Sequence, residues 1–206
     1  MVSEPLGESN PYNFKGFSMI SASDFRKGTK FLYENEPYMV VDFQHVKPGK
    51  GGAFVRTKMK SMLTNLMREA TFRVEEKFNA PDIQYKDLQY LYQDGNSYCF
   101  MDQEAFDQVY LSRAQVEEAA DYLKEQEIYS IVYFDGKPIS VNPPIFVEFK
   151  VVESPPGVRG NTAQGGATKS ATLDTGLILQ VPLFVEEGDI IKVDTRTGEY
   201  VERVKK

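Results

Sequence analysis

The chain of 206 residues contains only one cysteine and one histidine. Its one cysteine, Cys99, excludes an internal disulfide, which fits a reducing compartment, so we expect a cytoplasmic protein. Its one histidine, His45, has no serine or cysteine pattern near it, which leaves a catalytic triad or a zinc site unsupported. No run of roughly 18 apolar residues occurs, so we expect no membrane-spanning helix.

Signatures of other enzyme classes are also missing. The sequence has no phosphate-binding Walker pattern and no dinucleotide fingerprint. Its acidic pairs, such as Glu75-Glu76 and Glu186-Glu187, are sequence neighbours and do not indicate the opposed carboxylates of a glycosidase. We therefore expect no enzymatic activity, no metal and no cofactor. His45 is interpreted as a packing or hydrogen-bonding residue.

Charge is distributed unevenly along the chain. Residues 18–81 contain 11 lysine and arginine residues against 7 acidic residues, which gives a net charge of +4. Residues 82–145 contain 4 against 12, a net charge of −8, and residues 146–206 contain 8 against 9. The basic region is compatible with a polyanionic partner, and the pattern fits plain solvation equally well.

A glycine-rich segment at 47–52 separates two strand-like apolar runs at 38–43 and 53–59. Two such runs joined by a short glycine-rich connection predict a β-hairpin. The hairpin lies in the basic part of the chain, so its tip is the first candidate for a functional loop.

The tip of this hairpin is expected to present one long cation, Lys50. Pro48 fixes its own φ near −65°, and Gly49, Gly51 and Gly52 add no side chains beside the lysine. The backbone can therefore approach another surface closely. From the residues alone, the loop is either a contact-making finger or a solvated turn.

The pattern along the chain predicts an all-β protein with one short helix. Ser112 and Gln115 have the spacing of a capping box at the start of that helix, whose apolar face includes Val116 and Leu123. We expect a disordered extension at 1–18 and three small domains at 19–81, 82–145 and 146–206. Strands are expected at 30–33, 38–43, 53–59, 70–78, 88–92, 97–101, 128–134, 146–152, 176–182, 190–193 and 200–204, and a long loop at 154–170.

Three motifs occur in order along the chain. The first comprises 19–21 and 24–28, and the second comprises 46–51 and 53–56. The third is a C-terminal signature followed by 194–201, made of Lys169, Ala171, Gly176, Leu179, Val181, Pro182, Val185 and Gly188. With these three motifs, the chain from Met19 to Lys206 resembles bacterial translation elongation factor P.

The resemblance implies a fold and a function. The first domain would be an SH3-like barrel of the KOW type, the next two would be OB-folds, and the whole would have an L shape similar to a tRNA. The family binds both ribosomal subunits beside the peptidyl-tRNA and promotes peptide-bond formation at stalled sites such as consecutive prolines. No membrane is involved.

The resemblance also implies roles for particular residues. Lys50 would contact the CCA end of the peptidyl-tRNA and would be open to covalent modification by a lysine-modifying enzyme. Pro48, Gly49 and Gly51 would shape the apex around it. Contacts to tRNA would come from Tyr200 and Arg203. Separately, the net charge of +4 gives the hypothesis that Arg56, Arg26, Lys30 and Lys58 contact the backbone of tRNA or rRNA, and a solvated face explains each of these four equally well.

Two main alternatives and one weaker one remain at this point. One is a paralogue similar to elongation factor P that relieves different stalls. The other is a KOW and OB protein that binds nucleic acid in association with transcription. An enzyme dependent on His45 is the weakest alternative.

Overall fold

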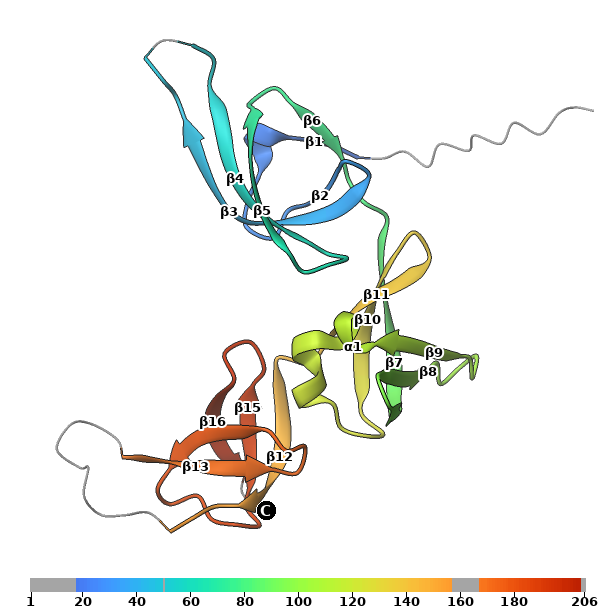
Figure 1. Ribbon diagram of the computed structural model, residues 1–206, viewed down its shortest axis with the longest axis vertical. Coiled ribbons are helices and arrows are strands. Elements are labelled where there is room, and N and C mark those ends of the chain that lie inside the picture. Colours follow the sequence, from blue (N-terminus) through green and yellow to red (C-terminus); the bar gives the residue numbers. More distant parts are fainter. Residues whose placement is uncertain (1–17, 50, 157–166, 205–206) are drawn as a thin grey trace, which may run out of the picture. The chain divides into compact units, whose positions relative to one another are not determined.

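The computed structural model describes residues 18–49, 51–156 and 167–204, and it is built mainly of β-strands (Figure 1). The expected extension at 1–18 lies outside these residues except for Ser18. The chain forms two compact units, one ending at Asp82 and the other beginning at Ile83. The prediction of a mostly β protein is confirmed.

The first unit contains a four-stranded antiparallel sheet in the order β2-β3-β4-β5 and a two-stranded sheet of β1 and β6. Its core is unusually aromatic. Phe25 and Phe31 are fully buried with ring centroids 4.7 Å apart, and Phe72 and Phe78 pack at 4.8 Å. The elements are β1 (Met19–Ser21), η1 (Ala22–Asp24), β2 (Lys30–Tyr33), β3 (Glu36–Val46), β4 (Phe54–Ser61), β5 (Met67–Arg73) and β6 (Lys77–Asn79).

The single strand expected at 70–78 is wrong, because a turn divides it into β5 and β6. The amide of Glu76 donates to the carbonyl of Arg73 (3.0 Å), and the Glu76 carboxylate accepts from the Arg73 amide (3.2 Å). After this turn β6 pairs with β1 instead of continuing beside β4. The polar run at 75–77 interrupts the alternation of apolar residues at this turn, although apolar residues flank it on both sides.

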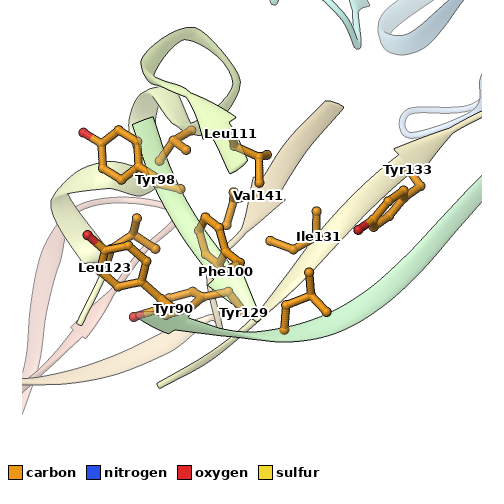
Figure 2. Close-up of a cluster of buried hydrophobic side chains, with 12 residues drawn as sticks. Tyr90, Tyr98, Phe100, Leu111, Leu123, Tyr129, Ile131, Tyr133 and Val141 are labelled. Carbon is orange, nitrogen blue, oxygen red and sulfur yellow. The ribbon is translucent and has the colours of Figure 1, made fainter. Parts of the chain in front are cut away.

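The second unit begins with a five-stranded antiparallel sheet in the order β11-β10-β7-β8-β9. Asp-Gly pairs between apolar runs predict tight turns, and Asp94-Gly95 and Asp135-Gly136 form such turns, with φ of +56° at Gly95 and +75° at Gly136. Figure 2 shows the aromatic and aliphatic side chains that fill the core of this sheet. The strands are β7 (Ile83–Asp94), β8 (Ser97–Met101), β9 (Gln108–Ser112), β10 (Ile128–Phe134) and β11 (Lys137–Asn142).

The expected helix starts after Ser112 but is shorter than its pattern indicates. Gln115 Oε1 accepts from the Ser112 amide (2.9 Å), as in the expected capping box. The α-helix α1 covers only Arg113–Val116, and the 3-10 helix η2 continues over Glu117–Tyr122. Glu117 has φ of +39°, which interrupts the α-helix. The apolar face is preserved, since Val116 and Leu123 are buried.

The last five strands form a second antiparallel sheet of this unit, in the order β14-β13-β12-β15-β16. Its core is aliphatic around the fully buried Phe149. The expected loop at 154–170 is shorter than predicted because β13 already begins at Thr168, and residues 157–166 lie outside the described part. The strands are β12 (Phe146–Glu153), β13 (Thr168–Leu173), β14 (Ile178–Pro182), β15 (Ile190–Asp194) and β16 (Glu199–Val204).

Segment 121–124 joins the two sheets of the second unit. Tyr122 packs against Phe149, with ring centroids 6.4 Å apart. The Tyr129 hydroxyl, in the buried core of the first sheet, donates to the Tyr122 carbonyl (2.9 Å) and accepts from the Lys124 amide (2.7 Å). The segment is therefore held from both sides. Over the described residues, no helix is long and apolar enough to cross a bilayer.

Candidate functional site

The β3–β4 hairpin is the structure that carries the glycine-rich loop. Its arms are paired out to the base of the loop, where Val46 lies opposite Phe54 and His45 lies opposite Val55. Val55 is fully buried in the core of the first unit, so the arm is anchored close to the loop. The expected hairpin is present.

The described residues of the loop are accessible. Pro48 and Gly49 are exposed, and a Cβ added at Gly49 would meet nothing within 4 Å. Gly51 has φ of +101°, a conformation that L-residues with side chains rarely adopt. Lys50 itself lies outside the described residues.

One face of the β3–β4–β5 sheet carries exposed cations near the loop. Arg56 lies between Gln44 and Thr71, and Lys58 lies two residues further along β4 on the same face. Both cations are exposed. A surface depression of about 610 Å³ crosses the three strands here and is lined by Asp42, Phe43, Gln44, Arg56, Thr57, Lys58, Glu69, Ala70 and Thr71.

Two acids also lie on this face, because Asp42 and Glu69 lie opposite Lys58 on the two neighbouring strands. Asp42 pairs with Lys27 at 3.2 Å, and hydrogen bonding to Lys27 lowers the pKa of Asp42. The Arg56 guanidinium lies 5.8 Å from the centroid of the Phe54 ring. Arg56 therefore combines an aromatic contact with exposed donors, an arrangement suited to binding phosphate.

The base of the hairpin is braced by Phe43. The Arg26 guanidinium lies 5.8 Å from its ring centroid and donates to the Phe25 carbonyl (2.7 Å). The His45 ring meets Phe43 edge-to-face at 5.4 Å. The interpretation of His45 as a packing residue agrees with this contact. Lys30, another residue proposed to contact the nucleic-acid backbone, is the first residue of β2.

The other candidate residues, Tyr200 and Arg203, lie on β16. A bulge shifts the pairing with β15, so that Tyr200 lies opposite Val193 and Arg203 lies opposite Ile191. Residues directly opposite in an antiparallel pair share a face, and Val193 and Ile191 are two apart. Tyr200 and Arg203 therefore share one face of β16, although a regular strand would place residues three apart on opposite faces.

Both side chains are held by their own sheet. Tyr200 is partly buried against the core of the second sheet. The Arg203 guanidinium lies 5.4 Å from the Phe184 ring centroid, and its Nη1 donates to Asp189 Oδ2 (3.3 Å). Phe184 and Asp189 were not among the residues expected from the sequence. The only signal in the sequence is that each is next to a residue of the C-terminal signature, Val185 or Gly188.

The structure thus collects the predicted residues into two groups. Pro48, Gly49, Gly51 and Arg56 belong to one hairpin of the first unit, and Tyr200 and Arg203 share a face in the second unit.

Three family models match the chain in succession. The KOW-like domain of elongation factor P matches residues 21–78, its OB domain matches 83–141, and its C-terminal domain matches 147–203. Together they span most of the chain. The chain belongs to the elongation factor P family. It is therefore a translation elongation factor, built from a KOW-like domain followed by OB-type domains, and the transcription-associated alternative is wrong.

Individual relatives agree with this assignment. Elongation factor P of Alkaliphilus metalliredigens is 55% identical over 186 residues, covering 90% of this chain and all of the relative. That of Clostridioides difficile is 52% identical with the same coverage. A solved structure, eukaryotic translation initiation factor 5A from Methanococcus jannaschii, aligns with a TM-score of 0.53 at 20% identity, over 64% of this chain and 96% of that one, which supports the fold.

Proposed function

We propose that this factor binds the ribosome beside the peptidyl-tRNA and promotes peptide-bond formation at stalled sites such as consecutive prolines. Lys50 would position the CCA end of the tRNA. The proposal is supported by the β3–β4 hairpin of this chain, which belongs to the family. Its loop is exposed at Pro48 and Gly49, and Gly51 has a positive φ that favours glycine.

The proposed mechanism is positional. Proline is a poor nucleophile in a rigid ring, and a chain of prolines can misplace the reacting ester. Holding the tRNA end reduces the entropic cost of reaching the reactive geometry, which is worth several kcal/mol in well-oriented systems. The ribosomal RNA would supply the chemistry, so the factor itself needs no catalytic group.

Cationic and aromatic side chains would provide the remaining contacts. Arg56 would bind a phosphate near the loop, with Lys58, Arg26 and Lys30 adding backbone contacts. Tyr200 and Arg203 would contact the tRNA from their shared face of β16. With its first and last domains bound to one ribosome in the cytoplasm, the factor would contact both ribosomal subunits.

Lys50 is also the proposed target of a modifying enzyme. A covalent extension would lengthen its reach toward the tRNA. Intact-mass measurement of the native protein, followed by sequencing of the peptide that contains Lys50, gives an added mass if the lysine is modified and the unmodified mass otherwise.

The decisive experiment substitutes the lysine. Lys50→Ala should slow synthesis through a Pro-Pro-Pro sequence in a reconstituted translation system, while leaving a proline-free message unchanged. Lys47→Ala is the matched control, because it removes the same charge from the same loop and should have a smaller effect. If Lys50→Ala is as fast as wild type on Pro-Pro-Pro, the proposed role is wrong. Testing several stall sequences also distinguishes a paralogue with other preferences.

A further inference from the structure

The surroundings of Arg203 form a small built site on the second unit. Its guanidinium is bounded on one side by the Phe184 ring, with 5.4 Å between the guanidinium carbon and the ring centroid. On another side it is bounded by the Asp189 carboxylate, at 3.3 Å from Nη1 to Oδ2. The Arg203 side chain remains 41% exposed. One donor is thus engaged within the protein, while the side chain stays open to a partner.

Asp189 is held in place by hydrogen bonds to the backbone, independently of Arg203. Its Oδ2 accepts from the Glu186 amide (2.9 Å), its own amide donates to the Glu186 carbonyl (3.2 Å), and its carbonyl accepts from Val151 (2.9 Å). The turn that holds it also contains Gly188, which has φ of +90° and donates to the Val151 carbonyl. The backbone hydrogen bond from Glu186 and the contact with Arg203 lower the pKa of Asp189, so the carboxylate stays ionised.

Phe184 is presented outward by an anchored neighbour. Val185 is fully buried, and its amide donates to the Pro182 carbonyl (3.1 Å). Phe184 itself is 56% exposed. A guanidinium over the ring gives such an exposed phenyl group a cation–π partner.

We propose that Phe184 and Asp189 are positioning residues that hold the Arg203 guanidinium in one orientation for a phosphate of the bound tRNA. This inference rests on the proposed contact between Arg203 and tRNA. A guanidinium has five N–H donors, and Asp189 engages one of them. Ordering the side chain in advance reduces the conformational entropy lost on binding.

The negative charge of Asp189 makes the inference testable. Near a phosphate a carboxylate alone is repulsive, so removing it should strengthen binding unless it acts through Arg203. The two effects have opposite signs. They separate in a double-mutant cycle, in which Asp189 is replaced both with and without Arg203 present.

The experiment measures equilibrium binding of the full chain to ribosomes that hold peptidyl-tRNA stalled at consecutive prolines. Arg203→Ala should weaken binding about 10-fold, and Asp189→Ala and Phe184→Leu should each weaken it about 3-fold. In an Arg203→Ala background, Asp189→Ala should have no effect or should strengthen binding. Asp189→Glu should restore part of the loss.

Glu202→Ala is the matched control. It removes a carboxylate from the residue next to Arg203 on β16, where Glu202 pairs with Lys192 on the other face. It should not weaken binding. Melting temperatures of all variants should be recorded, and Phe184→Leu, which changes an exposed side chain, tests the inference if Asp189→Ala proves unstable.

The outcomes separate the inference from the proposal beneath it. If Arg203→Ala binds like wild type, the proposed tRNA contact of Arg203 is wrong. If Arg203→Ala weakens binding while Asp189→Ala and Phe184→Leu do not, that contact stands and the positioning role is wrong. Equal losses from Asp189→Ala with and without Arg203 would show a general structural effect and would also overturn the inference.

Discussion

Lys124, in the segment that joins the two sheets of the second unit, donates from Nζ to the backbone carbonyl oxygen of Glu148 on β12 (2.8 Å). The same ammonium lies 5.7 Å from the centroid of the Phe149 ring and 3.9 Å from Asp174. The Lys124 side chain, which lies between η2 and β10, therefore connects segment 121–124 with the second sheet of this unit. Thr175 adds a hydrogen bond to the Asp121 carbonyl (3.0 Å).

Lys124→Met should weaken this connection while keeping the apolar stem of the side chain. We expect a loss of about 1 kcal/mol of unfolding free energy, because a charged hydrogen bond at a partly exposed site is removed. Urea unfolding measures the loss, and amide exchange should rise in segment 121–124. The exposed Lys137 on β11 gives the control, Lys137→Met, and an equal loss there would contradict the assigned role.

Gly198 should tolerate a methyl group poorly. Its φ is +72°, and an added Cβ would lie 3.3 Å from the Tyr122 hydroxyl. Gly136 has a similar φ of +75° with nothing within 4 Å, so Gly136→Ala measures the backbone strain alone. We expect each variant to lose about 1 kcal/mol from strain and Gly198→Ala to lose more, because Tyr122 must shift.

Thermal unfolding of both variants gives the comparison. Equal melting temperatures for Gly198→Ala and Gly136→Ala would show that Tyr122 does not restrict this turn. Restoration of Gly198→Ala by Tyr122→Phe would confirm that the hydroxyl is the crowded atom.

Stability should fall at alkaline pH because of Tyr129. Burial raises the pKa of Tyr129 to about 12, against 10.0 in the unfolded chain. Between pH 10 and 12 the unfolded state loses this proton while the folded state keeps it, so unfolding becomes more favourable as the pH rises. The loss from this group should approach about 2 to 3 kcal/mol at pH 12.

Tyr129→Phe tests this linkage. The variant should lose about 1 to 3 kcal/mol near pH 7, because the Tyr122 carbonyl and the Lys124 amide lose their partner. Its stability should also fall less steeply from pH 10 to 12. An unchanged slope in urea titrations across this range would assign the alkaline loss to other groups.

Arg56 should contribute to the salt dependence of ribosome binding. If Arg56 neutralises one phosphate, Arg56→Ala should reduce the slope of log affinity against log salt concentration by about 1. Arg68 is the control in the same sheet, because Glu34 binds it with two hydrogen bonds and Tyr33 lies under it. If Arg68→Ala reduces the slope and Arg56→Ala leaves it unchanged, the phosphate contact assigned to Arg56 is wrong.

Local sequence signals predicted much of the fold. The Asp-Gly pairs mark tight turns, because glycine tolerates positive φ, and the hairpin arms follow their apolar runs. The division of 70–78 was missed because the polar run at 75–77 is short and does not by itself specify the turn that the Glu76 carboxylate closes. The shortening of α1 at Glu117 escapes prediction as well, because packing of Val116 and Leu123 favours the same face in either kind of helix.

The candidate site was predictable only where it resembles a family motif. The glycines and the proline of the loop predict an unusual backbone conformation, and Gly51 has one, with φ of +101°. The contacts of Arg203 could not be expected, because Phe184 and Asp189 approach it from a turn between other strands. Nor does the spacing of Tyr200 and Arg203 reveal their shared face.

The bulge in β16 has a consequence for comparing relatives of this chain. A relative with the same two residues between the tyrosine and the arginine but without the bulge would follow strict alternation and place the two side chains on opposite sides of the strand. Identity at two aligned columns is thus an incomplete test of whether another protein has kept this pair. The bulge between the two columns must be kept as well.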